Sequence, residues 1–136
     1  MAIYTNLPVY KASYNLMLTL CRMMPNLPRD CRYSIGQETQ RKMMDVIILI
    51  YNANRERNKI SIIRKIQDAM LEVQVYVRLM NDMKYISEKK YFELIELIVS
   101  ITKQMSAWER SEKNKKSGEE ACGNVEILQS INGQDY

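Results

Sequence analysis

Histidine is absent from the sequence, which removes the commonest general base and metal ligand from the chemistry to consider. Three prolines and four glycines are present, and after Pro28 no proline interrupts a helix. The cysteines are Cys21, Cys31 and Cys122, an odd number at wide spacing that forms neither a metal motif nor a disulfide framework. These absences favour a helical protein with free thiols, and we expect a cytoplasmic location.

Long apolar runs are missing as well. The longest, VIILIY at residues 46–51, is far too short to cross a bilayer, so we expect no membrane contact. The N-terminal residues lack the basic start and apolar core of a signal peptide. Hydrophobic residues still make up 46% of the 136 residues, which is enough to bury the core of one ordinary domain.

Four segments with apolar residues at helical spacing predict four helices. The first begins near Pro8, because proline suits the first turn of a helix. The second begins at Ser34 and runs to about Arg55, because Ser34 and Gln37 form a capping-box pattern. Glycine at position 36 is then costly, and a close approach of another backbone would explain it. The expected caps of the other helices are Asn6 for the first, Asn58 or Ser61 for the third and Ser87 for the fourth.

Each predicted helix has an apolar stripe, and in the last two the stripe fills six of six heptad core positions. The predicted core is Tyr10, Tyr14, Met17, Cys21 and Met24, in a stripe widened by Leu16, Leu18 and Leu20; Ile35, Thr39, Met43, Val46, Ile47, Ile50 and Asn54; Ile63, Ile66, Met70, Val73, Val77 and Met80; and Tyr91, Leu94, Ile98, Ile101, Met105 and Trp108. Short turns between such helices predict an all-α fold, an antiparallel up-down-up-down four-helix bundle over residues 1–110. Residues 111–136 are polar apart from VEIL, and we expect a flexible polar tail there.

Positive charge is concentrated in the predicted bundle, which has 17 basic and 11 acidic residues up to Arg110, a net charge of +6. A basic domain of this kind typically meets nucleic acid, an acidic protein or an anionic membrane. An ordinary solvated surface is the alternative for each basic cluster. The candidate nucleic-acid-binding residues lie on the second helix and around the turn that follows it: Arg41, Lys42, Arg55, Arg57, Lys59, Arg64 and Lys65.

Arg78 lies in VQVYVRLM, residues 73–80, the most apolar part of the third predicted helix. An unpaired buried charge is costly, and Asp82 is four residues later, where it is in position to pair. Two interpretations stay open. One is a structural, buried ion pair between Arg78 and Asp82. The other is a contact with a second subunit or a partner protein.

Acidic and thiol side chains give little support for catalysis. Glu93 and Glu96 are spaced as in half of a di-metal carboxylate site, but such bundles need Glu-x-x-His pairs. Cys31 lies between Arg29 and Arg32, which would lower its pKa, but it has no histidine partner. We therefore expect no catalytic residue, no metal site and no cofactor, and a protein that is not an enzyme.

Surplus apolar residues lie off the core stripes of the second and fourth predicted helices, at Ile48, Tyr51, Phe92, Ile95 and Val99. Exposed apolar patches usually mark interfaces, so we expect a homo-oligomer.

Five segments in a fixed order carry a family resemblance: LPVYKASYNLM (7–17), NLPRDCRYSIGQ (26–37), VIILIYNANRERNK (46–59), VRLMNDMKYISEKKY (77–91) and SAW (106–108). Together they resemble the accessory variability determinant (Avd) proteins of diversity-generating retroelements. They are similar, more distantly, to the four-helix proteins encoded in ribosomal RNA intervening sequences. The resemblance covers about residues 7–110.

The resemblance implies a four-helix bundle that assembles into a pentameric barrel and is not an enzyme. It also implies binding to RNA and DNA and to the element's reverse transcriptase, in support of mutagenic cDNA synthesis and retrohoming. The positions carried over for the reverse-transcriptase contact are Arg78 and Lys103. Gln74 stands where some relatives have another basic residue. The alternative is a homo-oligomeric helical protein-interaction scaffold with no direct nucleic-acid role.

Overall fold

The computed structural model describes the backbone of residues 6–131 and the side chains of residues 6–118. The helices are α1 (Pro8–Met23), α2 (Arg29–Cys31), α3 (Gln37–Arg55), α4 (Ile60–Asp82) and α5 (Glu88–Ile131). A short 3-10 turn, Met24–Asn26, follows α1, and a π-helical turn, Arg32–Gly36, joins α2 to α3 without a break. No strand occurs within residues 6–131, and the predicted all-α bundle is confirmed.

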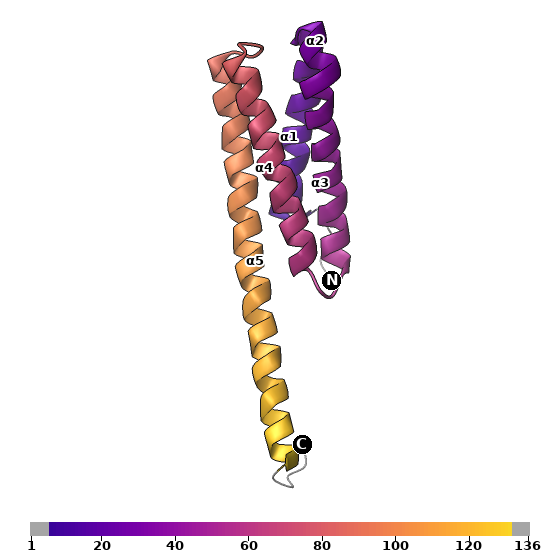
Figure 1. Ribbon diagram of the computed structural model, residues 1–136, viewed down its shortest axis with the longest axis vertical. Helices are drawn as coiled ribbons and strands as arrows, with labels where there is room; N and C mark the ends of the chain where they lie inside the picture. The colour runs from indigo at the N-terminus through magenta and orange to yellow at the C-terminus, as the bar shows by residue number, and fades with distance from the viewer. Residues whose placement is uncertain (1–5, 132–136) are drawn as a thin grey trace.

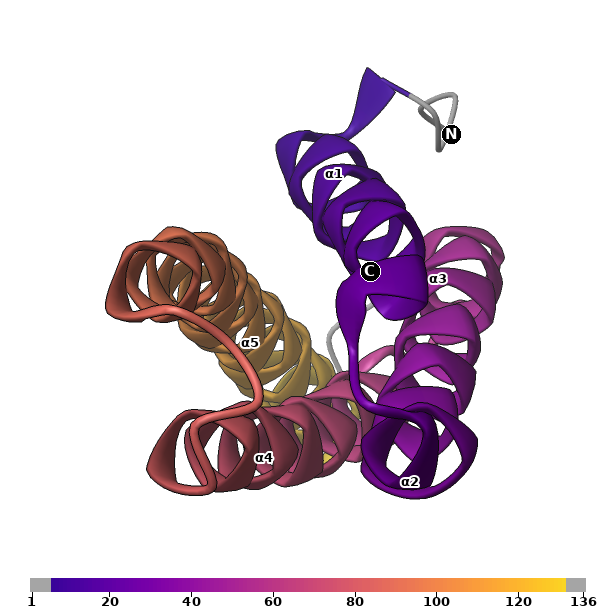
Figure 2. The same cartoon turned by 90° about the horizontal axis from the view of Figure 1, so that it is seen from above.

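The four long helices surround one core. α1 packs against α3 and α5, and α4 packs against the same two helices from the other side. In Figure 1 the chain ascends along α1, descends along α3, ascends along α4 and descends along α5. Figure 2, seen from above, shows α1 and α4 on opposite sides of the bundle, with α3 and α5 between them.

The core stripe of α4 matches the prediction at every position, because all six of its heptad residues are completely buried. In α5, Leu94, Ile98, Ile101 and Met105 are buried, while Tyr91 and Trp108 are partly buried at the two ends of the stripe. Full burial of one such aliphatic side chain stabilises the fold by about 1.5–3 kcal/mol. These two stripes therefore supply much of the driving force for the bundle.

The predicted stripe of α1 is partly wrong: Leu16 and Leu20, which were expected to widen it, are buried, but its main line is off by one residue. The buried residues are Val9, Ser13, Leu16, Leu20 and Met23, each of which precedes a predicted position. A shift of one residue turns a helix by about 100°. Both lines have the same spacing, so spacing could not choose between them. The leucines face the core, and Tyr14 stays half exposed, where its ring stacks on that of Tyr10 at a centroid distance of 6.1 Å.

The predicted start of the second helix at Ser34 is also wrong, because helical backbone begins at Arg29, directly after Pro28. Ser34 lies inside the π-helical turn, and its hydroxyl donates to the carbonyl of Asp30 instead of capping a helix. Gly36 is buried there. A Cβ at this position would lie 2.9 Å from Met24 Sδ, 3.1 Å from Leu27 Cδ1 and 3.2 Å from the backbone carbonyl oxygen of Cys31, so two side chains and the nearby backbone of Cys31 together favour glycine.

One of the four expected side-chain caps is confirmed. Ser87 Oγ accepts from the Lys90 amide at 3.1 Å, at the start of α5. The expected caps Asn6, Asn58 and Ser61 are wrong, because Leu7 and Lys59 occupy the N-cap positions of α1 and α4 and neither helix has a side-chain cap.

α5 continues well past the bundle, and Figure 1 shows it projecting beyond the other helices. The backbone from residue 111 to Ile131 is therefore helical where the sequence led us to expect a flexible tail. No proline interrupts this segment. Two ion pairs at helical spacing support its first turns. Lys113 Nζ lies 3.3 Å from a Glu109 carboxylate oxygen, and Lys115 Nζ lies 3.4 Å from a Glu112 carboxylate oxygen.

The domain boundary at Arg110 stays a prediction. Within the described residues, no helix combines the length and the apolar character that a bilayer span requires.

Candidate nucleic-acid interface

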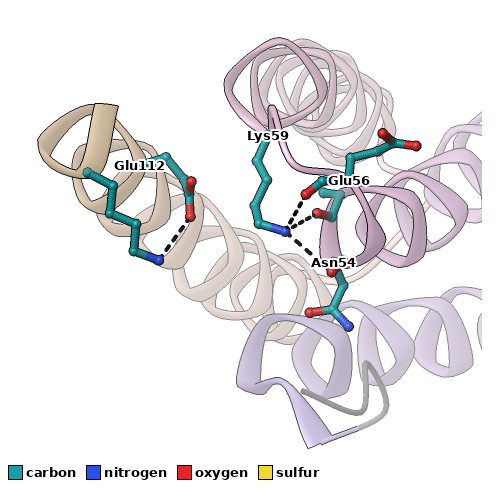
Figure 3. Close-up of polar contacts among 6 residues, drawn as sticks. Asn54, Glu56, Lys59 and Glu112 are labelled. Carbon is teal, nitrogen blue, oxygen red and sulfur yellow. Dashed lines mark hydrogen bonds and ion pairs between the residues drawn. The ribbon is translucent and has the colours of Figure 1, made fainter. Parts of the chain in front are cut away.

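The α3–α4 turn is organised by Lys59. Its ammonium donates to three backbone carbonyls at the C-terminal end of α3, those of Ala53 at 2.7 Å, Asn54 at 3.3 Å and Glu56 at 2.7 Å. Figure 3 shows the side chain reaching back toward the end of α3. An ammonium has three donors, and the last carbonyls of a helix lack partners within the helix. Lys59 thus satisfies these carbonyls and places a positive charge at the negative end of the helix dipole.

The arginines on either side of Glu56 are exposed. The guanidinium of Arg55 lies over the ring of Tyr51, 5.0 Å from the centroid. Arg57 is at the tip of the turn, and within the described part of the chain its side chain has no hydrogen bond or ion pair. Both guanidinium groups are therefore accessible to an anion.

Arg64 belongs to a clasp between α4 and α5. Glu109, on α5, accepts from Gln67 at 3.0 Å and from Arg64 at 3.3 Å, and Lys113 lies at 3.3 Å. The hydrogen bonds from Gln67 and Lys113 lower the pKa of Glu109, and the one from Gln67 has the larger effect. Lys65, the next residue, is exposed and forms no ion pair with the residues that the structure describes.

Arg41 and Lys42 are on α3 and are already paired with carboxylates. Arg41 binds Glu38 one turn earlier, and this hydrogen bond raises the pKa of the arginine. Lys42 Nζ lies 2.8 Å from Glu72 on α4, and the hydrogen bond with Glu72 raises the pKa of the lysine. A phosphate at these positions would compete with a resident carboxylate. Of the seven predicted residues, Arg55, Arg57 and Lys65 are therefore the most available.

Two lysines that were not predicted from the sequence join this end of the bundle. Because α5 continues as a helix, Lys115 and Lys116 lie beside the α3–α4 turn, across two adjoining hollows of about 560 and 500 Å³. We call these hollows the end cavity. Its lining consists of Leu7, Asn54, Arg55, Glu56, Arg57, Asn58, Lys59, Ile60, Trp108, Glu112, Lys115 and Lys116. The signal was the run KNKK at 113–116, which lies in the segment expected to be a flexible tail.

The two predicted reverse-transcriptase contacts lie on different helices. Arg78 is on the outer face of α4, where its side chain is 75% exposed and its Nε lies 3.8 Å from an Asp82 carboxylate oxygen. The interpretation as a buried pair is therefore wrong, although the two residues do pair. Lys103 is exposed on α5, in a shallow hollow of about 340 Å³ with Thr102, Ser106 and Arg110. No contact or hollow of the described residues joins Arg78 to Lys103.

Exposed apolar side chains occur on α3, α4 and α5. Four of the five predicted positions are exposed, namely Ile48, Tyr51, Phe92 and Val99, and Ile95 is partly buried. A longer patch on α4 was not predicted, where Leu71, Val75 and Leu79 are exposed beside Arg78. This patch, with Arg78, is called the α4 face below.

Cys31 is buried, and burial raises the pKa of its thiol. The expectation of a lowered pKa is wrong, because the side chain lies in the core rather than among the neighbouring arginines. In the part of the chain whose side chains are described, no three acidic or cysteine side chains gather closely enough to hold a metal ion.

Comparison with known proteins gives one family. A search of the curated proteins found no match. A family model described as bAvd-like matches residues 9–112, which contain the bundle and every predicted site residue. Lys115 and Lys116 lie beyond the matched residues. Since the match covers well over half of the chain, the protein belongs to the bAvd-like family, the accessory variability determinant proteins of diversity-generating retroelements.

Proposed function

We propose that the protein is a non-catalytic accessory protein of a diversity-generating retroelement. It binds RNA or DNA and the element's reverse transcriptase in the cytoplasm, and supports mutagenic cDNA synthesis and retrohoming. Family membership supports the general role. The observation that carries nucleic-acid binding is the end cavity, where five basic side chains line the same hollows as two carboxylates.

The energetic basis of binding is counterion release. Each phosphate neutralised contributes about 0.7–0.9 to the slope of log affinity against log salt concentration. One subunit has a modest charge, so we propose that a homo-oligomer, specifically a pentamer, brings several copies of the basic surface to one strand. The exposed apolar side chains of α3, α4 and α5 support self-association.

The reverse-transcriptase contact is proposed at Arg78, with Lys103 as a second contact. Arg78 is accessible and lies among exposed Leu71, Val75 and Leu79. An arginine surrounded by apolar side chains is a frequent centre of a protein interface. This placement supports a protein partner at the α4 face and leaves the end cavity to nucleic acid.

A salt titration tests the proposal. Binding of the purified full chain to fluorescent RNA and DNA of several sequences is measured by anisotropy, and the oligomer mass by light scattering. We expect similar affinities for all sequences, a linear loss of log affinity with log salt, and a mass of five chains. Absence of binding at low salt would reject the nucleic-acid role.

The second candidate is a homo-oligomeric helical scaffold with a protein partner and no direct nucleic-acid role. The α4 face favours it, since its exposed area is apolar rather than basic. Co-purification with the element's reverse transcriptase after nuclease treatment, together with absence of nucleic-acid binding by the chain alone, would select this candidate.

A further inference from the structure

Apart from Leu7, the end cavity is built from two segments that are distant in sequence. One wall is the α3–α4 turn, from Asn54 to Ile60, and the other is the part of α5 between Trp108 and Lys116. Figure 3 shows Lys59 of the turn between Glu112 on α5 and the end of α3, with its ammonium directed toward Glu56 and Asn54. The cavity exists only because α5 remains helical past the bundle.

The basic residues of the cavity differ in what they can still bind. Lys59 gives its three donors to the end of α3. Lys115 forms an ion pair with Glu112, whose side chain is only 11% exposed. Arg57 and Lys116 line opposite walls, and neither has a hydrogen bond or ion pair within residues 6–118. These two side chains, a guanidinium and an ammonium, are the free phosphate donors of the cavity.

An aromatic side chain completes the site. Trp108, the sole tryptophan of the chain, lines the second hollow together with Arg55, Arg57 and Lys115. Binding of single strands typically combines a basic groove for the backbone with an aromatic ring on which an unpaired base stacks. A duplex has no unpaired base to offer, and an acidic peptide has no base at all.

We propose that the end cavity is a binding site for single-stranded nucleic acid. Arg57 and Lys116 hold its phosphates from opposite walls, and Trp108 contacts a base. Glu112 lines the same hollows, and its carboxylate limits affinity. This assignment rests on the proposed nucleic-acid function and adds to it a contribution from α5 beyond the residues that the family model matches.

The test uses the full chain and Trp108 fluorescence. Its probes are an oligothymidylate single strand, the corresponding duplex with oligoadenylate, inorganic polyphosphate and polyglutamate. We expect the single strand to quench Trp108 at low salt and to bind more tightly than the duplex. Polyphosphate should compete without quenching by stacking. Equal or tighter binding of polyglutamate would overturn the assignment in favour of an acidic protein partner.

The variant series isolates the cavity from general charge. Lys115→Gln/Lys116→Gln should weaken single-strand binding on the order of tenfold and flatten the salt slope by about 0.7 for each phosphate that is no longer neutralised. The matched control is Lys89→Gln/Lys90→Gln, which removes two adjacent lysines at the start of the same helix. Lys90 is paired with Glu93, as Lys115 is paired with Glu112. The control should change affinity by less than about twofold. Glu112→Gln should strengthen binding, because it removes a negative charge and frees Lys115.

The outcomes separate this assignment from the broader proposal. If the wild-type chain binds but the Lys115/Lys116 variant behaves like its control, the end cavity is not the site and the proposed function stands. If the wild-type chain binds only the duplex, this assignment falls and the proposed function stands; if it binds neither single strand nor duplex, both fall. Circular dichroism of each variant must match the wild type, and a variant that loses helix is replaced by Arg57→Gln, whose side chain lies at the exposed tip of the turn.

Discussion

The α3–α4 turn and the α4 face both contain basic residues, yet the fold depends on them to different degrees. Lys59 at the turn gives three hydrogen bonds to backbone carbonyls. Arg78 on the α4 face is exposed, with one ion pair at 3.8 Å. Exposed pairs of that kind contribute at most about 1 kcal/mol, whereas hydrogen bonds from a charged group to otherwise unpaired carbonyls contribute more. A basic residue can therefore be structural in one region and available to a partner in the other.

The largest expected effect is at the turn. Lys59→Ala leaves the last carbonyls of α3 to water and should lower the free energy of unfolding by about 1–3 kcal/mol. Lys59→Arg keeps the charge, but its planar donor fork cannot reach three converging carbonyls equally well, so it should restore only part of the loss. Urea unfolding followed by circular dichroism measures both.

Lys65→Ala is the control for the turn, because Lys65 is an exposed lysine of α4 without an ion pair among the described side chains. It should stay within about 0.5 kcal/mol of the wild type. If Lys59→Ala also leaves the free energy of unfolding unchanged, the turn does not depend on this lysine. The turn and the α4 face would then not differ in how much the fold depends on their basic residues.

The sequence predicted the region between α4 and α5 better than the region around α1. In α4 every core position was predicted, because apolar residues fill all six heptad positions without interruption. In α1, Tyr10 and Tyr14 repeat with the spacing of Val9 and Ser13, and only packing decides which line faces inward. Local pattern thus determines a helix but not always its rotation.

The site was less predictable than the fold. The charges at positions 55–59 were identified, but the carbonyls that Lys59 binds come together only when α3 ends and the chain turns back. Lys115 and Lys116 required α5 to continue, and their polar surroundings gave no apolar stripe to indicate it. Contacts between distant segments, such as Glu109 with Gln67, are set by tertiary packing and have no counterpart in a local motif.

A middle-sized effect is expected at the α4–α5 clasp, through pH. The pKa of Glu109 is lowered by its hydrogen bonds with Gln67 and Lys113, so the folded state binds the Glu109 proton less tightly than the unfolded state. The resulting stability is present above the ordinary pKa of a glutamate and is lost as the pH falls toward the lowered value. Glu109→Gln should therefore reduce stability at neutral pH and flatten its decline under acid.

Urea unfolding at neutral and acidic pH measures this effect, with Glu96→Gln as the control. Glu96 is an exposed glutamate on α5 and has no ion pair within the part of the chain whose side chains are described. The clasp would be unimportant if both variants showed the pH dependence of the wild type. That outcome would also mean that the pair of Arg64 with Glu109 adds little to stability.

The smallest expected effect on stability is at the α4 face, and it gives the contrast its functional meaning. Arg78→Ala removes an exposed guanidinium with a single long ion pair, so the free energy of unfolding should change by no more than about 0.5 kcal/mol. Nucleic-acid affinity of the chain should also stay within about twofold, since one exposed charge far from the bound strand contributes little. Association with the reverse transcriptase, measured by pull-down with the purified polymerase, should be lost or strongly weakened.

Asp82→Asn is the complementary variant at the α4 face. It removes the carboxylate that pairs with Arg78, so Arg78 stays available and the association should be preserved. If Arg78→Ala unfolds the protein, or leaves polymerase binding intact, the α4 face is not the polymerase contact, and its exposed leucines and valine are left to self-association.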